Sequence, residues 1–404
     1  MTTEPRSACR ACESADLVEA VDFGLLPLTD PTPDSSGPAQ RHPLQLVLCL
    51  KCALLQLRHG LPAGAPANLA RPRFSALRPL EQRGLERIAG ARIARRQLGP
   101  NSLVLEIGSS DGRRLLPYAQ RGLRVLGVEP CEARAAVARG AGVPTLHASF
   151  DLACAESLKR SGLRPELILV GRALALSPDP GELLRGLARL ATSATSIVIE
   201  VPYVVDMVES GAFDRIEHAQ HGYFSLTTLT RLLPSLGLWV SDAERSGSSL
   251  CVHVAPHQHS SPAVRELLCD ETVLGLARAP YYEAFARRTQ RSCDRLRRLL
   301  CELTQRGARV AAYGAGPRAV RLLNAAGIGR HLLAWVADPS PARQGRRLPG
   351  AQVPVVDPTQ ILLDLPDYVL LLPGTPPDEV AEEHAEYRRH GGKFIVPLPE
   401  LEIV

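Results

Sequence analysis

Short apolar runs alternate with amphipathic stretches along most of the chain. Runs at 103–105, 123–128, 145–151, 167–170 and 197–201 predict buried strands, and the amphipathic stretch 83–97 predicts a helix before the first of them. Strands that alternate with helices are typical of a parallel, doubly wound sheet. Further along, 308–313 and 332–336 predict strands on either side of a helix at 317–326, which a helix at 291–306 precedes. The pattern therefore predicts two separate βαβ units.

Composition narrows the class of protein. With 404 residues, of which 45% are hydrophobic and 22% charged, the chain has enough apolar side chains for two or three packed domains, which excludes a disordered chain. The formal charge of +5 is small and the arginines are scattered, so nucleic acid is not an expected partner. No signal-peptide core or apolar run of membrane-spanning length is found, so we expect a cytoplasmic protein without a membrane partner.

Four of the ten cysteines form two C-x2-C pairs. Cys9 and Cys12 make the first pair, and Cys49 and Cys52 make the second. Two such pairs can supply the four thiolates of a tetrahedral zinc site, which has no open position for catalysis. The alternative is four uncoupled cysteines. The spacing favours a structural zinc ion, and the other six cysteines are expected to be ordinary side chains.

The segment 102–116, SLVLEIGSSDGRRLL, predicts a ligand loop between the strand at 103–105 and a helix. Glycines let the backbone turn sharply and leave room for a ligand beside the helix N–H groups. The next predicted strand ends in Glu129, where a carboxylate can bind a ribose. The loop lacks the G-x-G-x-x-G of a nicotinamide site and resembles motif I of the class I S-adenosylmethionine (SAM) methyltransferases, and its carboxylates suit a cationic ligand better than a pyrophosphate. The predicted cofactor-binding residues of this loop and strand end are Glu106, Gly108, Ser109, Asp111, Gly112 and Glu129.

Two other groups have alternative interpretations. Asp151 either caps a helix or recognises the adenine of the cofactor. His257 and His259 lie close together in a loop, but without further ligands they are expected to be solvent-exposed rather than metal-binding.

The order of motifs resembles one known family. The zinc-type cysteines, LEIGSSDG, the segments 199–218, 223–233 and 247–256, and the C-terminal segments 310–328 and 344–354 are together similar to the zinc-containing sugar C-methyltransferases that act on nucleotide-linked deoxysugars in antibiotic pathways. The resemblance implies a monomeric α/β protein with three domains. These are an N-terminal zinc-binding domain (1–70), a class I SAM methyltransferase domain with a Rossmann-like fold (71–288), and a second Rossmann-like domain that binds the sugar nucleotide (289–404).

Substrate contacts are expected in the last domain and at Tyr203. A glycine turn at Gly314 and Gly316, with Arg318 in the first turn of the next helix, can seat a phosphate or can be a simple strand-to-helix turn. Asp338 either takes the ribose-binding acidic position or caps a loop.

The implied reaction is methyl transfer to carbon through an enolate, which needs a base and a group that stabilises the enolate oxygen. The chain departs from the family pattern here, because Ala219, Gln220 and Leu176 stand at family catalytic positions and residues 70–75 lack the family tyrosines. One hypothesis is a rearranged set of catalytic residues that methylates another atom. The alternatives are a non-catalytic accessory protein and a different reaction on a sugar nucleotide, and the histidines and glutamate can equally be ordinary loop and surface residues. The candidate catalytic residues are Glu217, His218, His221 and Tyr223.

Overall fold

The computed structural model describes residues 5–28, 40–61 and 79–404, which form three β-sheets with flanking helices. The first sheet is antiparallel, in the order β1 (Leu17–Pro27), β2 (Arg41–Cys49), β3 (Leu55–Leu57) and β9 (Gly222–Tyr223). Its last strand comes from the middle of the chain, and Leu55 pairs with Tyr223. The N-terminal sheet is therefore completed by the segment that carries the candidate catalytic residues.

The central sheet has seven strands in the order β10-β11-β8-β7-β4-β5-β6. Strands β8, β7, β4, β5 and β6 pair in parallel, and β11 and β10 extend the sheet in antiparallel fashion. All five predicted strands are present, although β6 ends earlier than predicted. The bounds are β4 (Leu103–Ile107), β5 (Arg124–Glu129), β6 (Thr145–His147), β7 (Leu167–Val170), β8 (Ser196–Pro202), β10 (Trp239–Ser246) and β11 (Ser249–Ala255).

The third sheet has the order β14-β13-β12-β15-β16-β17 and is parallel except for β17. Its bounds are β12 (Val310–Tyr313), β13 (Val336–Ala337), β14 (Val355–Val356), β15 (Tyr368–Leu371), β16 (Lys393–Val396) and β17 (Glu402–Ile403). The strand predicted at 332–336 was placed too early, because β13 pairs with its neighbours only at Val336 and Ala337.

Helices flank the two Rossmann-like sheets. Around the central sheet they are α1 (Pro79–Arg96), α2 (Leu116–Ala119), α3 (Glu132–Gly140), α4 (Leu152–Arg160), α5 (Ala173–Leu176), α6 (Pro180–Leu190), α7 (Val204–Glu209), α8 (Leu226–Leu232) and α9 (Pro262–Leu274). Around the third sheet they are α11 (Pro317–Ala325), α12 (Gln360–Asp364), α13 (Pro377–Glu383) and α14 (Ala385–Arg389). Two 3-10 turns lie at Phe213–Arg215 and Leu233–Leu236.

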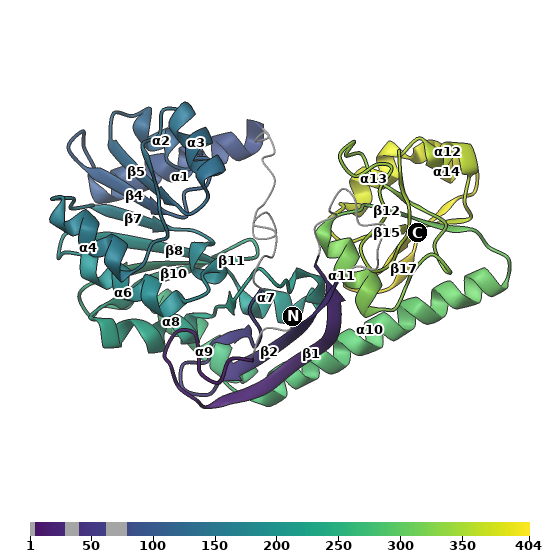
Figure 1. Ribbon diagram of the computed structural model, residues 1–404, viewed down its shortest axis with the longest axis horizontal. Helices are drawn as coiled ribbons and strands as arrows, with labels where there is room; N and C mark the ends of the chain where they lie inside the picture. The colour runs from purple at the N-terminus through teal and green to yellow at the C-terminus, as the bar shows by residue number, and fades with distance from the viewer. Residues whose placement is uncertain (1–4, 29–39, 62–78) are drawn as a thin grey trace.

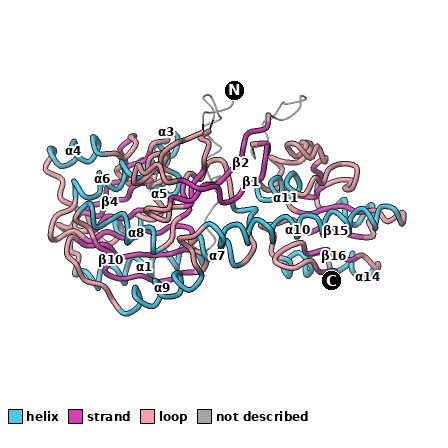
Figure 2. The backbone as a smooth tube through the Cα atoms, turned by 90° about the horizontal axis from the view of Figure 1, so that it is seen from below, coloured by secondary structure: helices cyan, strands magenta, loops and turns pink. Residues whose placement is uncertain are grey.

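A long helix, α10 (Ala279–Gln305), joins the central unit to the C-terminal unit (Figure 1). It begins before the helix predicted at 291–306, and the predicted domain boundary at 288/289 falls inside it. Both α10 and α11 pack against β1, so the N-terminal sheet lies between the other two units (Figure 2). No described helix has both the length and the apolar character needed to cross a bilayer.

Candidate functional site

The four predicted zinc ligands lie together. The Sγ atoms of Cys9 and Cys52 are 3.6 Å apart, as are those of Cys12 and Cys49, and all four lie within 4.8 Å of one another. A tetrahedron with Zn–S bonds of about 2.3 Å has S···S edges of about 3.8 Å, so the thiolates fit a zinc ion. Backbone N–H groups of Ala11 and Cys52 also point at ligand sulfurs, at 3.5 Å.

This zinc knuckle packs against the central unit. The Arg10 guanidinium donates to the carbonyls of Leu57, at 3.2 Å, and Pro178, at 3.0 Å. A Cβ added to Gly181 would lie 2.7 Å from the carbonyl oxygen of Ala11, so only glycine allows this close approach. The knuckle thus supports the start of α6, beside Pro178 and Asp179, which line a cavity at the carboxyl end of the central sheet.

The loop after β4 forms the floor of a cavity of about 700 Å³ at the carboxyl end of the central sheet. Gly108 (φ +70°) and Gly112 (φ +76°) adopt left-handed conformations, and Ser110 does so as well (φ +54°). A Cβ on Gly108 would lie 2.7 Å from the Cβ of Ala173, and a Cβ on Gly112 would lie 3.0 Å from that of Val143. The predicted glycines are therefore required by the backbone conformation and by packing.

The three carboxylates predicted in the loop and at the end of β5 line this cavity and have different partners. Glu129 accepts hydrogen bonds from the backbone N–H groups of Ser110 at 2.9 Å and Cys131 at 3.0 Å, which fixes the second strand against the loop. Asp111 forms an ion pair with Arg113. Glu106 lies 3.3 Å from Arg114 Nε through Oε1, while its buried Oε2 has no hydrogen-bond partner among the described residues. Burial raises the pKa of Glu106 to about 7.

The remaining cofactor candidates also lie at this cavity. Asp151 lines it and caps α4, accepting from the Cys154 N–H at 2.8 Å, so its helix-capping role is present in the fold. Ser109 lines it too, and its buried hydroxyl lies where Gly127 leaves space, since a Cβ there would be 2.3 Å away. The partnerless Glu106 oxygen and the glycine loop fit a cationic, nucleoside-bearing ligand such as SAM.

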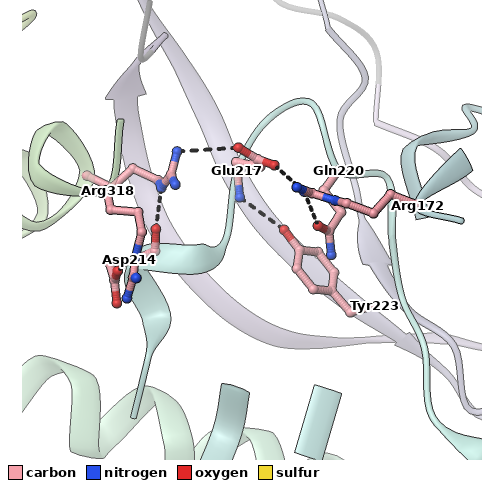
Figure 3. Close-up of polar contacts among 7 residues, drawn as sticks. Arg172, Asp214, Glu217, Gln220, Tyr223 and Arg318 are labelled. Atoms are coloured by element: carbon pink, nitrogen blue, oxygen red, sulfur yellow. Dashed lines mark hydrogen bonds and ion pairs between the residues drawn. The ribbon is translucent and has the colours of Figure 1, made fainter. Parts of the chain in front are cut away.

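A polar cluster lies beside this cavity (Figure 3). Arg172, which follows β7 and lines the cavity, donates to Glu217 Oε1 at 3.2 Å and to Gln220 Oε1 at 3.5 Å. The other Glu217 oxygen lies 3.7 Å from Arg321 Nη1 on α11. Glu217 is therefore held between a cation at the cofactor cavity and a cation of the C-terminal unit.

The other three catalytic candidates are buried. Tyr223 accepts from the backbone N–H of Glu217 at 3.0 Å, and burial raises its pKa. His218 Nε2 lies 3.2 Å from the His42 carbonyl, whereas His221 Nδ1 is buried without a partner among the described residues. Burial lowers the pKa of each histidine to about 4, so both imidazoles are neutral at pH 7. Among the described residues that line the cavity, neither histidine appears.

The side chains of the C-terminal unit that were predicted to bind phosphate and ribose, Arg318 and Asp338, form ion pairs within the protein. Arg318 pairs with Asp214, a fully buried carboxylate of the central unit (Figure 3). Asp338 accepts from the Ala315 N–H at 2.7 Å, from Arg343 at 2.8 Å and from the Ser340 N–H at 2.9 Å. The two backbone contacts are those expected of a loop-capping carboxylate, one of the two predicted roles of Asp338.

The glycine turn of this unit has the predicted form. Gly314 (φ +96°) lies at the end of β12, and a Cβ there would be 2.4 Å from Thr375 Oγ1. Gly316 is the N-cap of α11.

Tyr203, a predicted substrate contact, has a partner within the protein. Its hydroxyl donates to Glu271 at 2.8 Å, and the same carboxylate accepts from the Leu226 and Thr227 N–H groups at the start of α8. The ring is buried, because it lies at the start of α7 under Arg245. In this structure the Tyr203 hydroxyl is therefore used in a contact that stabilises the start of α8.

Three residues of this region were not predicted: Arg172, Asp214 and Arg321. Arg172 follows Gly171 at the carboxyl end of a parallel strand, the usual place for ligand-binding side chains, and that position was an available signal. Asp214 and Arg321 had none, since they are 107 residues apart in sequence. Residues 70–75 lie outside the described part of the chain.

The fold and the cofactor cavity together define a SAM-dependent methyltransferase with a structural zinc site. Family models match three consecutive regions: "Putative zinc binding domain" at 9–65, "Methyltransferase domain" at 77–241, and "C-methyltransferase C-terminal domain" at 244–399. The chain is 34% identical to the C-methyltransferase NovU of Streptomyces niveus over 410 residues, covering 99% of this chain and 97% of that protein. It belongs to this C-methyltransferase family, which confirms the resemblance found in the sequence.

Two solved methyltransferase structures resemble slightly less than half of the chain. Magnesium protoporphyrin IX methyltransferase from Synechocystis PCC 6803, with bound S-adenosylhomocysteine, is 14% identical with a TM-score of 0.35, covering 45% of this chain and 90% of that one. A ribosomal protein L11 methylase from Lactobacillus delbrueckii subsp. bulgaricus is 12% identical with a TM-score of 0.30, covering 46% and 82%.

Proposed function

We propose that this C-methyltransferase methylates a carbon atom of a nucleotide-linked deoxysugar, through an enolate. The observation that carries the proposal is the Arg172–Glu217–Arg321 cluster, which links the cofactor cavity to the C-terminal unit. The family resemblance supports the acceptor class and a division into zinc-binding (1–70), cofactor-binding (71–288) and acceptor-binding (289–404) parts. Arg318 and the turn at Gly314 and Gly316 are the proposed phosphate contacts.

Glu217 is the proposed base. Its side chain is 23% exposed, whereas His218, His221 and Tyr223 are buried, and the Tyr223 hydroxyl holds the backbone of Glu217 in place. In the proposed step, Glu217 accepts the proton from the carbon beside a keto group, and the electron pair of the C–H bond forms the enolate. SAM, when bound, supplies the electrophilic methyl group, to which this carbon forms a bond as the methyl–sulfur bond breaks.

Arg172 is the proposed group that stabilises the enolate oxygen. Its side chain is 52% exposed and it lines the cofactor cavity, so it can reach an acceptor without leaving its place after β7. A guanidinium aimed at a developing negative charge lowers the barrier to proton removal. Its present contacts with Glu217 and Gln220 keep the base and the cation together.

The test uses SAM with an isotopically labelled methyl group and a panel of thymidine- and uridine-diphosphate-linked 4-keto-6-deoxysugars. Label on a sugar carbon is expected, and Glu217→Gln should reduce its appearance about 100-fold or more. Glu266→Gln, at an exposed position on α9, is the matched control and should leave the rate unchanged. In deuterium oxide, exchange of the acceptor's C–H proton by the wild type and not by Glu217→Gln would identify the base.

A non-catalytic accessory protein is the second candidate, favoured by Ala219 and Gln220 at family catalytic positions. It predicts binding of nucleotide sugars without label transfer or proton exchange on any member of the panel. Label on a nitrogen or oxygen atom would instead assign a different acceptor to the same site.

A further inference from the structure

A second cavity, of about 260 Å³, lies at the amino ends of the parallel strands of the central sheet, opposite the cofactor cavity. Leu167 and Ser196, which line it, are the first residues of β7 and β8. Ile107 and Gly171, which line the cofactor cavity, lie at or just past the ends of β4 and β7. Because these strands are parallel, a ligand in the second cavity is separated from the methyl donor by the length of the sheet.

One wall of this cavity is basic. Arg92, Arg95 and Arg96 extend from the last turns of α1 at three- and four-residue spacing, which places them on the same face of the helix. Arg95 pairs with Asp242 at 3.1 Å, and Arg96 has no carboxylate within ion-pair distance among the described residues. Among the described residues, the lining thus holds three guanidinium groups and one carboxylate, which Arg95 binds.

The opposite wall carries further hydrogen-bond donors, with the Glu244 carboxylate within 4.8 Å of the ring nitrogen of His253. His253 on β11 and the loop residues His257 and His259 line it, and Ser261 caps the 13-residue helix α9. The positive end of α9 therefore faces the arginines. Asp242 lies between them: it accepts from Ser261 Oγ at 2.8 Å as well as pairing with Arg95. A carboxylate of the protein itself already uses part of this anion-attracting field.

We propose that this second cavity binds the phosphate group of a small molecule, with Arg92, Arg95 and Arg96 as its donors. Planar guanidinium groups match the oxygens of phosphate and bind them in bidentate fashion, and the excess of arginine over carboxylate suits a doubly charged anion. The cavity is small, at about 260 Å³, and the arginines elsewhere are scattered, which favours a small molecule over a nucleic acid strand. The histidines after β11 then have a role as additional donors.

The experiment is calorimetric titration of the zinc-loaded full chain with inorganic diphosphate, in the presence of saturating S-adenosylhomocysteine to fill the cofactor cavity. The variant R95Q/R96Q should bind diphosphate at least about tenfold more weakly. The matched control R83Q/R87Q removes two exposed arginines from the same helix and should change the affinity by less than about twofold. Both variants should keep the wild-type affinity for S-adenosylhomocysteine, which shows that they are folded.

A second arm distinguishes the sources of the phosphate. Tighter binding of adenosine or thymidine diphosphate than of inorganic diphosphate, lost in R95Q/R96Q, indicates a nucleotide, whereas equal affinities indicate that the phosphates alone are recognised. Three results overturn the proposal: no heat of binding up to about 10 mM diphosphate, equal losses in both arginine pairs, or a loss in R318Q without one in R95Q/R96Q. The last result would place the anion in the acceptor site. Failure of methyl transfer leaves the proposal intact, because the two sites are separate.

Discussion

Glu106 connects cofactor affinity to pH. Its side chain is 2% exposed, Oε1 lies 3.3 Å from Arg114 Nε, and Oε2 has no partner among the described residues. Burial raises its pKa to about 7, so the group is half ionised near neutrality. We expect the cationic cofactor to bind the carboxylate form, and its affinity therefore to rise between pH 6 and pH 8.

The pKa sets the size of this effect. With a pKa of about 7, about one tenth of the groups are ionised at pH 6 and about nine tenths at pH 8, so the dissociation constant should fall by up to about tenfold. The raised pKa also means that the folded chain favours the protonated group. The ligand-free protein therefore loses stability as the pH rises from about 4.5 through about 7, by a total of about 3 kcal/mol. Glu106→Gln should remove this loss while weakening cofactor binding at pH 8.

The assay is calorimetric titration with S-adenosylhomocysteine at pH 6, 7 and 8, together with thermal unfolding of the ligand-free protein. The relevant slope is the difference between the wild type and Glu106→Gln, because titration of the ligand's amino group is common to both. Glu266→Gln should retain the wild-type slope. A wild type without a slope, or a Glu106→Gln variant that keeps it, would refute the assignment of this carboxylate to the cofactor.

Three further predictions concern the loop, the zinc site and the contact between units. Gly108→Ala should weaken S-adenosylhomocysteine binding and lower the thermal midpoint more than the control Gly122→Ala. Both glycines have positive φ, but only a Cβ on Gly108 would meet another Cβ. Calorimetry should show that Gly108→Ala is about 1–3 kcal/mol more destabilising than the control. Cys12→Ser should lower the zinc content measured by mass spectrometry below one ion per chain, whereas the exposed Cys269→Ser should keep it; equal content in both would contradict the site. Asp214→Asn should free Arg318 and tighten thymidine diphosphate binding. It should also lower the stability by about 2 kcal/mol, less than for a fully buried ion pair because the Arg318 side chain is 34% exposed. Unchanged affinity for thymidine diphosphate would argue against Arg318 as a phosphate contact.

The cofactor half of the molecule was predictable from the sequence. Strand β4, its glycine loop and Glu129 at the end of β5 lie within 27 residues of one another, and local turn chemistry determines most of their geometry. Gly108 and Gly112 have the left-handed conformations that their position implied. Four cysteines at zinc-type spacing were similarly informative, because the ligand set restricts the fold of the knuckle.

The acceptor half was less predictable, since distant segments assemble it. Arg172 meets Glu217 across 45 residues of sequence, and Arg318 meets Asp214 across 104. Burial then decides what each side chain can do. Tyr203 was a reasonable substrate contact from its motif, but Glu271, 68 residues away, binds its hydroxyl. None of these three contacts can be predicted from the spacing of residues in the sequence.

The zinc site and the cluster around Glu217 are connected through the N-terminal sheet. Cys52 leads into β3, where Leu55 pairs with Tyr223 of β9, and the Tyr223 hydroxyl accepts from the backbone N–H of Glu217. The Thr228 hydroxyl adds a second link by donating to the Ala53 carbonyl at 2.9 Å. Loss of zinc should therefore displace Glu217 relative to Arg172 and slow methyl transfer. It should weaken cofactor binding less, because the glycine loop is built on β4 and β5 and the knuckle reaches the cofactor cavity only through the start of α6. A zinc ion that takes no part in chemistry can in this way affect the rate of methyl transfer more than it affects cofactor binding.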